Sequence, residues 1–223
     1  MNLSKAWYQQ HKWLYFLWPL SIIYRVIIFL RKCTYKIGLR SVQHFSPLVI
    51  VVGNIVVGGT GKSPMVCYIA KLLRQQGLRV GLISRGYKGK ARSWPQIVYR
   101  DSDPELVGDE AVMLVQQTGC PMAVGPDRPA ALSALLQKYQ LDCIISDDGL
   151  QHYALGRDLE IVMVDAKRGL GNGLLLPAGP LRESSHRLRQ QEFVVMNGGG
   201  VDTQYHMHLV PTQVVHLQTG QQC

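Results

Sequence analysis

The first hundred residues of this 223-residue chain contain no aspartate or glutamate. The first acidic residue is Asp101, whereas sixteen of the twenty-four lysines and arginines precede it, so the net charge of +9 is concentrated in the N-terminal part. Such a cationic region suits a nucleic acid, an anionic membrane surface or a phosphorylated substrate. A solvated basic face without a dedicated partner would have the same composition.

Cysteine is also scarce, and its spacing is uninformative for metal binding. The five cysteines are odd in number and form no C-x-x-C pair, which argues against a disulfide framework and against a zinc site. Buried thiols in a reducing compartment are the expectation. The length allows one α/β domain with a good core and one additional element.

One long apolar run, Trp13–Leu30, lies near the N-terminus. It is near the lower length limit of about twenty apolar residues for a spanning helix, and Pro19 and Arg25 interrupt it. Basic residues flank it on both sides, which keeps both flanks on the cytoplasmic face. We therefore predict that residues 1–46 form a membrane-associated helical segment that lies in, or dips into, the membrane interface. A secretory signal peptide, which lacks its cleavage site here, and an ordinary buried helix are the alternatives.

The segment Pro47–Ser63, PLVIVVGNIVVGGTGKS, predicts a strand, a phosphate-binding loop and a helix in succession. Its glycines let backbone N–H groups approach an anion at the positive end of the helix dipole. Lys62 would reach the β- and γ-phosphates of a nucleoside triphosphate, and the Ser63 hydroxyl would ligate Mg²⁺. The residues expected to bind the nucleotide are Val56, Val57, Gly58, Gly59, Thr60, Gly61, Lys62 and Ser63.

This loop departs from the usual pattern G-x-x-x-x-G-K-[ST] at one position, because Val56 stands where the first glycine is expected. A glycine-rich turn that merely connects a strand to a helix is therefore the alternative. The Gly-Lys-Ser sequence between an apolar strand and an apolar-periodic helix favours the phosphate site.

A second signal is Asp142–Gly149, DCIISDDG, a short apolar strand that ends in Asp147 and Asp148. Adjacent carboxylates at a buried strand end repel each other unless a cation compensates them, so this pair predicts association with Mg²⁺. His152 follows on the same rim. A lone histidine is more often structural, but here it is a candidate for phosphate contact or proton handling.

Two further segments have both a functional and a structural interpretation. Arg85–Lys90 follows a predicted strand at 79–84, where Arg85 and Lys88 could contact a substrate phosphate while Tyr87 packs on the substrate, or where the loop is merely solvated. Asp109 and Glu110 begin a predicted helix, where carboxylates are favoured simply as caps.

Strand and helix patterns alternate from residue 47 to residue 197. Short connections between them predict a P-loop NTPase-like α/β domain, with a mostly parallel sheet and helices on both faces. The other expected strands are 96–99, 122–125, 159–165 and 192–196, and the other expected helices are 111–117, one that ends at 139 and a short basic one after 183.

Five motifs occur in an order typical of one enzyme family: Val51–Asn54 with Gly58–Pro64, Ser84–Tyr87, Gly108–Glu110, Asp147–His152 and Leu176–Glu183. On these motifs the chain resembles the tetraacyldisaccharide 4′-kinase family of lipid A biosynthesis, whose phosphate loop also lacks the first glycine. The resemblance implies transfer of the γ-phosphate of ATP, with Mg²⁺, to the 4′-hydroxyl of tetraacyldisaccharide 1-phosphate. It places the protein at the cytoplasmic face of the bacterial inner membrane.

The resemblance also assigns roles to residues of this chain. Lys62 and Ser63 would bind ATP and Mg²⁺, Asp109 would be the general base, and Asp147 with Asp148 would be the metal-associated pair. His152 joins Asp109, Lys62, Asp147 and Asp148 in the expected catalytic set. Positions expected to line the disaccharide and phosphate site are Arg85, Tyr87, Glu110, Arg128, Gln151, His152, Arg182 and Glu183.

Members of this family continue into a second α/β lobe that closes over ATP and supplies a histidine that supports the base. We therefore expect residues 198–223 to contain linker strands, at 206–211 and 214–217, that lead to a lobe absent from these 223 residues, and we expect little activity without it. The expected partners are a lipid A disaccharide precursor and membrane lipids, with the protein a monomer.

The alternative function is a membrane-associated P-loop switch ATPase of the partitioning or division-site type. Such a protein would have a second lysine early in the phosphate loop, where this chain has Val56 and Val57, and its membrane helix is usually C-terminal. A nucleic-acid-binding ATPase is less favoured, because the basic residues surround an apolar helix rather than a recognition module. We therefore expect no nucleic-acid partner.

Overall fold

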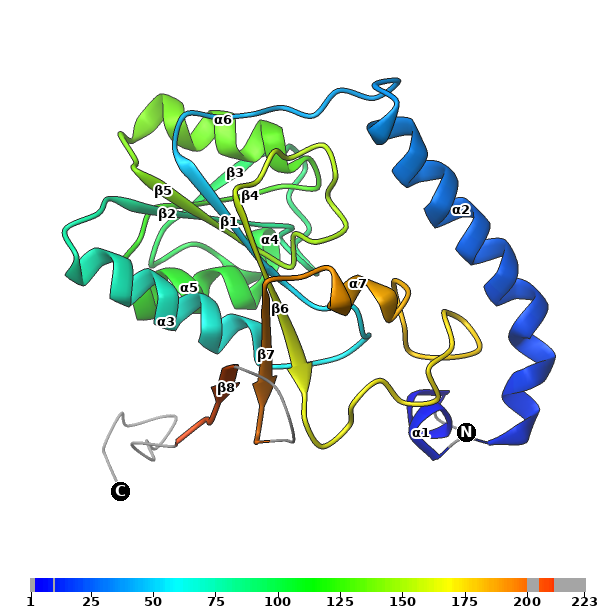
Figure 1. Ribbon diagram of the computed structural model, residues 1–223. Helices are drawn as coiled ribbons and strands as arrows, with labels where there is room; N and C mark the ends of the chain where they lie inside the picture. The colour runs from blue at the N-terminus through cyan, green and yellow to red at the C-terminus, as the bar shows by residue number, and fades with distance from the viewer. Residues whose placement is uncertain (1–2, 10, 200–204, 211–223) are drawn as a thin grey trace.

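The computed structural model describes residues 3–9, 11–199 and 205–210 (Figure 1). Its centre is an eight-stranded sheet with the strand order β3-β4-β2-β5-β1-β6-β7-β8. The strands are β1 (Leu48–Gly53), β2 (Val80–Ser84), β3 (Gln96–Val98), β4 (Met122–Val124), β5 (Cys143–Asp147), β6 (Leu159–Asp165), β7 (Phe193–Asn197) and β8 (Tyr205–Met207). Every described pairing is parallel except that of β3 with β4. The predicted mostly parallel sheet is confirmed.

Helices cover both faces of the sheet (Figure 1). The described helices are α1 (Leu3–Gln9), η1 (Lys12–Leu17), α2 (Trp18–Lys36), α3 (Lys62–Gln75), α4 (Pro104–Val107), α5 (Asp109–Thr118), α6 (Arg128–Lys138) and α7 (His186–Arg189). Of these, α3 and α5 lie on one face and α6 on the other, whereas α2 stands to one side of the sheet. Alternate residues of β1 point to opposite faces, so Ile50 and Val52 pack with α3 and α5, while Val49 and Val51 pack on the side of α6. The central strands are buried on both sides, which explains their unbroken apolar sequences.

The sheet continues beyond residue 197, the expected end of the kinase domain. The strand expected at 206–211 is overlapped by β8, which begins one residue earlier, ends at Met207 and pairs in parallel with β7 at the edge of the main sheet. The described part of this segment is thus an extension of the same sheet. The second expected strand, at 214–217, lies outside the described residues.

The apolar N-terminal run forms η1 and α2, which together span Lys12–Lys36 and contain an 18-residue window with a mean hydropathy of 1.8. Pro19 does not break the helix, because it lies in the first turn of α2, where its missing N–H has no helical partner anyway. Only 11% of the apolar segment is buried, so an ordinary buried helix, one of the alternatives, is wrong. By length and composition the segment could also cross a membrane.

The side of α2 that contacts the rest of the protein is polar. Ser21 Oγ accepts a hydrogen bond from Ala178 N at 3.0 Å and donates to Leu175 O at 2.9 Å. Tyr24 OH donates to the carbonyl of Arg182 at 3.3 Å. The outward side is apolar, and the exposed fraction of its large side chains reaches 63% for Phe29. In a surface helix of a water-soluble domain the apolar side faces the protein and the polar side faces water, so α2 has the opposite arrangement.

Candidate active site at the carboxyl edge of the sheet

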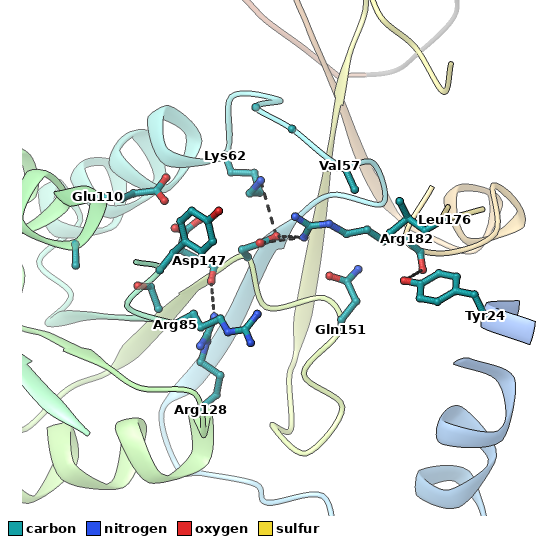
Figure 2. Close-up of a pocket in the computed structure, with 16 residues that line it drawn as sticks. Tyr24, Val57, Lys62, Arg85, Glu110, Arg128, Asp147, Gln151, Leu176 and Arg182 are labelled. Carbon is teal, nitrogen blue, oxygen red and sulfur yellow. Dashed lines mark hydrogen bonds and ion pairs between the residues drawn. The ribbon is translucent and has the colours of Figure 1, made fainter. Parts of the chain in front are cut away.

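A cavity of about 680 Å³ opens where β1, β2 and β5 end (Figure 2). Ligands of open parallel sheets bind at this edge, because the loops that follow the strands converge there. The lining residues are Tyr24, Val57, Gly58, Gly59, Lys62, Ser84, Arg85, Tyr87, Glu110, Ala111, Arg128, Asp147, Asp148, Gln151, Leu176 and Arg182. The predicted phosphate loop and carboxylate pair therefore meet in one cavity.

The phosphate loop is held by its own side chains. Asn54 Nδ2 donates to Gly58 O at 3.2 Å and to Thr60 Oγ1 at 3.0 Å, which closes the loop between β1 and α3. Gly61 adopts the left-handed conformation, with φ of 87°, immediately before α3 begins at Lys62. No side chain caps α3, so its first N–H groups are available to an anion.

The departure at Val56 has a structural explanation. Its side chain is 2% exposed, and its backbone forms an isolated bridge with Leu181. Val56 therefore packs into the core and does not line the cavity, whereas the next residue, Val57, does. A glycine is unnecessary at a position that faces the core rather than a phosphate.

Asp148 is held between two cations. Arg182 Nη1 lies 2.9 Å from Asp148 Oδ2, and Lys62 Nζ lies 3.8 Å from Asp148 Oδ1. Burial alone would raise the pKa of Asp148, but Lys62 and Arg182 outweigh it and hold the pKa below its usual value. Asp148 is thus a carboxylate that positions cations.

Asp147 has a different environment, although it is the next residue. It is 4% exposed, and among the described residues its Oδ1 has no hydrogen-bond partner. Burial, together with the carboxylates of Glu110 and Asp148, raises its pKa to about 7, against the opposing effect of Lys62 and Arg128. The two side chains diverge because Asp148 has a φ of 48°, which turns the chain sharply.

The unpartnered oxygen of Asp147 fits a divalent cation. Ser63 Oγ, the predicted hydroxyl ligand, donates a hydrogen bond to Glu110 Oε1, and the Glu110 carboxylate acts electrostatically on Asp147. The described part of the chain has no cluster of three histidine, cysteine or carboxylate side chains. Mg²⁺ does not need one, because it retains waters and takes phosphate oxygens alongside one or two carboxylates.

Arg128 is a buried cation that holds backbone groups at the edge of the cavity. It is 1% exposed, and its guanidinium donates to Gly125 O at 2.9 Å and to the backbone carbonyl of Asp147 at 3.3 Å. Burial lowers its pKa to about 10, so it remains charged at neutral pH. Arg85, Tyr87, Glu110 and Gln151, also predicted from the sequence, line the same cavity.

Seven predicted site residues do not line the cavity: Val56, Thr60, Gly61 and Ser63 of the phosphate loop, and Asp109, His152 and Glu183. Asp109 is exposed in the first turn of α5, where Gly108 is the N-cap, so it lies at the helix start where carboxylates are favoured. The pKa of His152 is lowered to about 4 by burial and by nearby arginines, so it is neutral at pH 7. Glu183 is 1% exposed and lies behind the cavity wall.

Tyr24 and Leu176 line the cavity but were not expected there. Tyr24 belongs to α2, and its distance in sequence from the other site residues conceals its role. The sequence contains a signal for this role, because Ser21 and Tyr24 are three residues apart in a mostly apolar run and therefore share one face of a helix.

The LpxK family model, described as tetraacyldisaccharide-1-P 4′-kinase, matches residues 13–223. A tetraacyldisaccharide 4′-kinase from Nitrosococcus oceani is 50% identical over 98% of this chain, and one from Legionella pneumophila (strain Corby) is 44% identical over 99%. The crystal structure of LpxK from Aquifex aeolicus in complex with ATP covers 82% of the chain with 34% identity and a TM-score of 0.74.

The matched chain is shorter than each of these relatives. It spans 64% of the Nitrosococcus oceani protein, 68% of the Legionella pneumophila protein and 58% of the Aquifex aeolicus chain. The match is nonetheless continuous from η1 to the end of the sequence, and it includes the phosphate loop and the carboxylate pair described above. The chain belongs to the tetraacyldisaccharide-1-phosphate 4′-kinase family.

Proposed function

We propose that the chain transfers the γ-phosphate of ATP to the 4′-hydroxyl of tetraacyldisaccharide 1-phosphate in lipid A biosynthesis. The observation that carries this proposal is the meeting of Lys62, Asp147 and Arg182 in one cavity of a chain from this kinase family. Family membership also argues against the alternative of a partitioning-type switch ATPase.

The charges around the cavity suit phosphoryl transfer, in which catalysis is mainly positioning and neutralisation of charge. The phosphate loop and Lys62 would hold the β- and γ-phosphates. Asp148 fixes the positions of Lys62 and Arg182, so both cations are in place before substrate arrives. Ser63, Glu110 and Asp147 would hold Mg²⁺, which would neutralise phosphate charge.

The acceptor hydroxyl needs a base. We assign this role to Asp109, whose neighbour Glu110 lines the cavity and whose own carboxylate is exposed at the start of α5. A carboxylate can accept the proton of a hydroxyl that is placed within hydrogen-bond reach. His152 is neutral, so it suits hydrogen bonding to a phosphate or hydroxyl better than charge neutralisation.

The apolar side of α2 supports a location on the cytoplasmic face of the bacterial inner membrane. Tyr24 contributes to the cavity from the polar side of the same helix. A lipid acceptor could therefore keep its acyl chains in the bilayer while its sugar enters the cavity. The basic flanks of the helix would contact anionic lipid headgroups.

The test is phosphate transfer from labelled ATP to tetraacyldisaccharide 1-phosphate in detergent micelles. It uses the purified chain and a chimera in which the C-terminal third of the Nitrosococcus oceani relative follows residue 223. Asp109→Ala should abolish transfer and retain nucleotide binding, Lys62→Ala should weaken both, and Lys71→Ala, an exposed lysine of α3, should change neither. ATP hydrolysis without lipid phosphorylation in both proteins would overturn the proposal in favour of a switch ATPase.

A further inference from the structure

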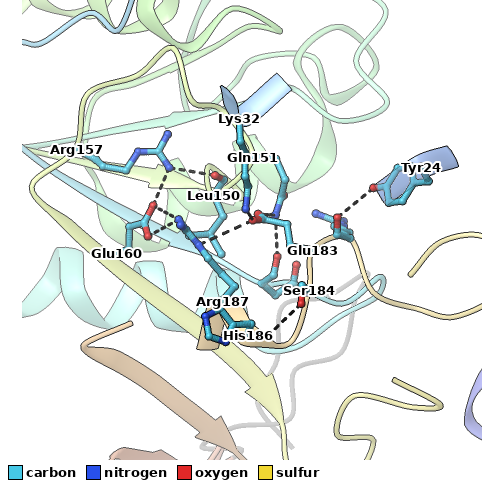
Figure 3. Close-up of polar contacts among 12 residues, drawn as sticks. Tyr24, Lys32, Leu150, Gln151, Arg157, Glu160, Glu183, Ser184, His186 and Arg187 are labelled. Carbon is cyan, nitrogen blue, oxygen red and sulfur yellow. Dashed lines mark hydrogen bonds and ion pairs between the residues drawn. The ribbon is translucent and has the colours of Figure 1, made fainter. Parts of the chain in front are cut away.

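Glu183 is a buried carboxylate that joins the N-terminal helix to the cavity wall (Figure 3). It is 1% exposed, and its two oxygens face different elements. Oε2 accepts a bond from Lys32 Nζ of α2 at 2.5 Å, whereas Oε1 accepts a bond from Gln151 Nε2 at 2.8 Å. Lys32 and Gln151 therefore share one carboxylate.

On the cavity side, Glu183 fixes the orientation of the Gln151 amide. Gln151 Nε2 also donates to Asn54 O at 3.3 Å, so both of its N–H groups have acceptors. The amide oxygen is then turned toward the cavity that Gln151 lines (Figure 2). An oxygen held in this way can accept a hydrogen bond from a sugar hydroxyl but cannot donate one.

The preceding residue, Arg182, also contacts both α2 and the phosphate-loop side, through its backbone. Arg182 N donates to Ile55 O at 2.7 Å, beside the phosphate loop, and Arg182 O accepts the Tyr24 hydroxyl of α2. Its side chain meanwhile holds Asp148. The backbone at 182–183 is thus attached to α2 on one side and to the phosphate loop on the other.

A second contact joins α2 to the segment after β5 that carries Gln151. Lys32 Nζ and Arg31 each lie 5.6 Å from the ring centre of Tyr153, and Tyr35 packs against this ring at 5.8 Å. Tyr153 is two residues after Gln151. Burial and the nearby Glu183 carboxylate raise the pKa of Tyr153, so the ring presents a neutral face to these cations.

Lys32 is the cation closest to Glu183. Arg187 Nε lies 3.9 Å away, but the guanidinium of Arg187 is bound to Glu160 at 2.6 Å. Removal of Lys32 would leave the buried Glu183 carboxylate with Arg187, a more distant cation, as its partner. The carboxylate and the Gln151 amide bonded to it would then tend to rearrange.

We propose that Lys32 and Glu183 are positioning residues through which α2 sets Gln151 and Arg182, and that the oriented Gln151 oxygen accepts a hydroxyl of the sugar acceptor. This inference rests on the proposed kinase function and adds a requirement to it. The membrane-facing helix is then part of the catalytic apparatus and not only an anchor. Turnover of a lipid acceptor depends on α2 through one ion pair.

The test compares Lys32→Gln with Lys36→Gln, which removes the same charge from an exposed position one turn later on α2. Lys32→Gln should lower kcat for the lipid acceptor roughly tenfold without changing the KM for ATP, whereas Lys36→Gln should change neither. Lys32→Arg should restore kcat. The double variant Lys32→Gln, Glu183→Gln should be more active than Lys32→Gln alone. It has no unpaired buried charge, and the amide oxygen at position 183 can still accept a bond from Gln151. Equal kcat values for Lys32→Gln and Lys36→Gln would overturn the proposal.

A second readout does not need catalysis. The side-chain amide resonances of Gln151, assigned by their loss in Gln151→Ala, should shift in Lys32→Gln and stay in place in Lys36→Gln. An unchanged Gln151 signal in Lys32→Gln overturns the positioning role even if the wild-type chain transfers no phosphate. ATP hydrolysis without lipid phosphorylation in both the chain and the chimera, with a shifted Gln151 signal, would instead refute the proposed function and leave the structural coupling intact.

Discussion

Arg182 Nη1 lies 3.0 Å from Oδ1 and 2.9 Å from Oδ2 of Asp148, so a single nitrogen bridges both oxygens of the carboxylate. Lys62 approaches the same group at 3.8 Å. A carboxylate shared by two cations has little capacity left for a metal ion. Asp147, whose Oδ1 has no partner among the described residues, therefore carries the metal-binding role of this pair in our proposal.

Asn substitutions should separate the two aspartates. Asp147→Asn should raise the Mg²⁺ concentration needed for half-maximal binding of a non-hydrolysable ATP analogue by roughly tenfold, because it removes a charged ligand. Asp148→Asn should leave this midpoint nearly unchanged and lower the transfer rate, because Lys62 and Arg182 lose their common anchor. The measurement is a Mg²⁺ titration of analogue binding. Equal midpoints for the two variants would contradict this division of roles.

The raised pKa of Asp147 predicts how stability depends on pH. The folded state holds this proton up to about pH 7, whereas the unfolded chain releases it near the usual value of 3.8. Between these values the folded state binds more protons, so the free energy of unfolding of the metal-free protein falls as pH rises, by at most about 1.4 kcal/mol per pH unit. In urea unfolding at pH 5 and pH 7.5, this fall should appear as the difference between the wild type and Asp147→Asn.

His152 predicts the opposite slope in nearly the same pH range. The pKa of His152 is about 4 in the folded protein and near the usual 6.5 in the unfolded chain. Between these two values the unfolded chain therefore binds one proton more than the folded protein. The stability that His152 contributes is complete above pH 6.5 and is lost as pH falls toward 4. Asp147→Asn should therefore reveal stability that rises with pH, and adding His152→Gln should flatten it. A ring titration near pH 6.5 by NMR would refute the assignment.

Features encoded within a few consecutive residues were predictable. The alternation of apolar strands with periodic helices identified the parallel sheet, and the glycine spacing before Lys62 identified the phosphate loop. The neighbouring carboxylates Asp147 and Asp148 were also recognisable as one site. In each case the information lies in local spacing, which the fold preserves.

Features created by tertiary packing were not predictable. The separate roles of Asp147 and Asp148 depend on the left-handed backbone at Asp148 and on Arg182, which is 34 residues away in sequence. Asp109 and Glu110 look equivalent in the sequence, but neighbours on a helix point about 100° apart, so only Glu110 faces the cavity. Val56 faces the core because its backbone bridges to Leu181.

Two glycines of the phosphate loop should respond differently to alanine. A methyl group at Gly61 would lie 2.6 Å from Asn197 Nδ2, and the φ of 87° is already unfavourable for alanine. Gly61→Ala should lower the free energy of unfolding by about 1–3 kcal/mol. Gly59 has no atom within 4 Å of such a methyl and no positive φ, so Gly59→Ala should leave the unfolding midpoint unchanged. Equal thermal midpoints for the two variants would refute this loop conformation.

The exposed apolar side of α2 should determine membrane binding. Ile27 is 58% exposed on the side away from the protein, so Ile27→Glu removes apolar surface from the interface without disturbing the core. Flotation with vesicles containing anionic phospholipid should show roughly tenfold weaker binding, because burial of an isoleucine contributes about 1.5–3 kcal/mol. Leu72→Glu, at an exposed position of α3, is the matched control and should bind as the wild type does. If both variants bound equally well, the apolar side of α2 would need another partner, since water alone does not explain a helix whose polar side faces the protein.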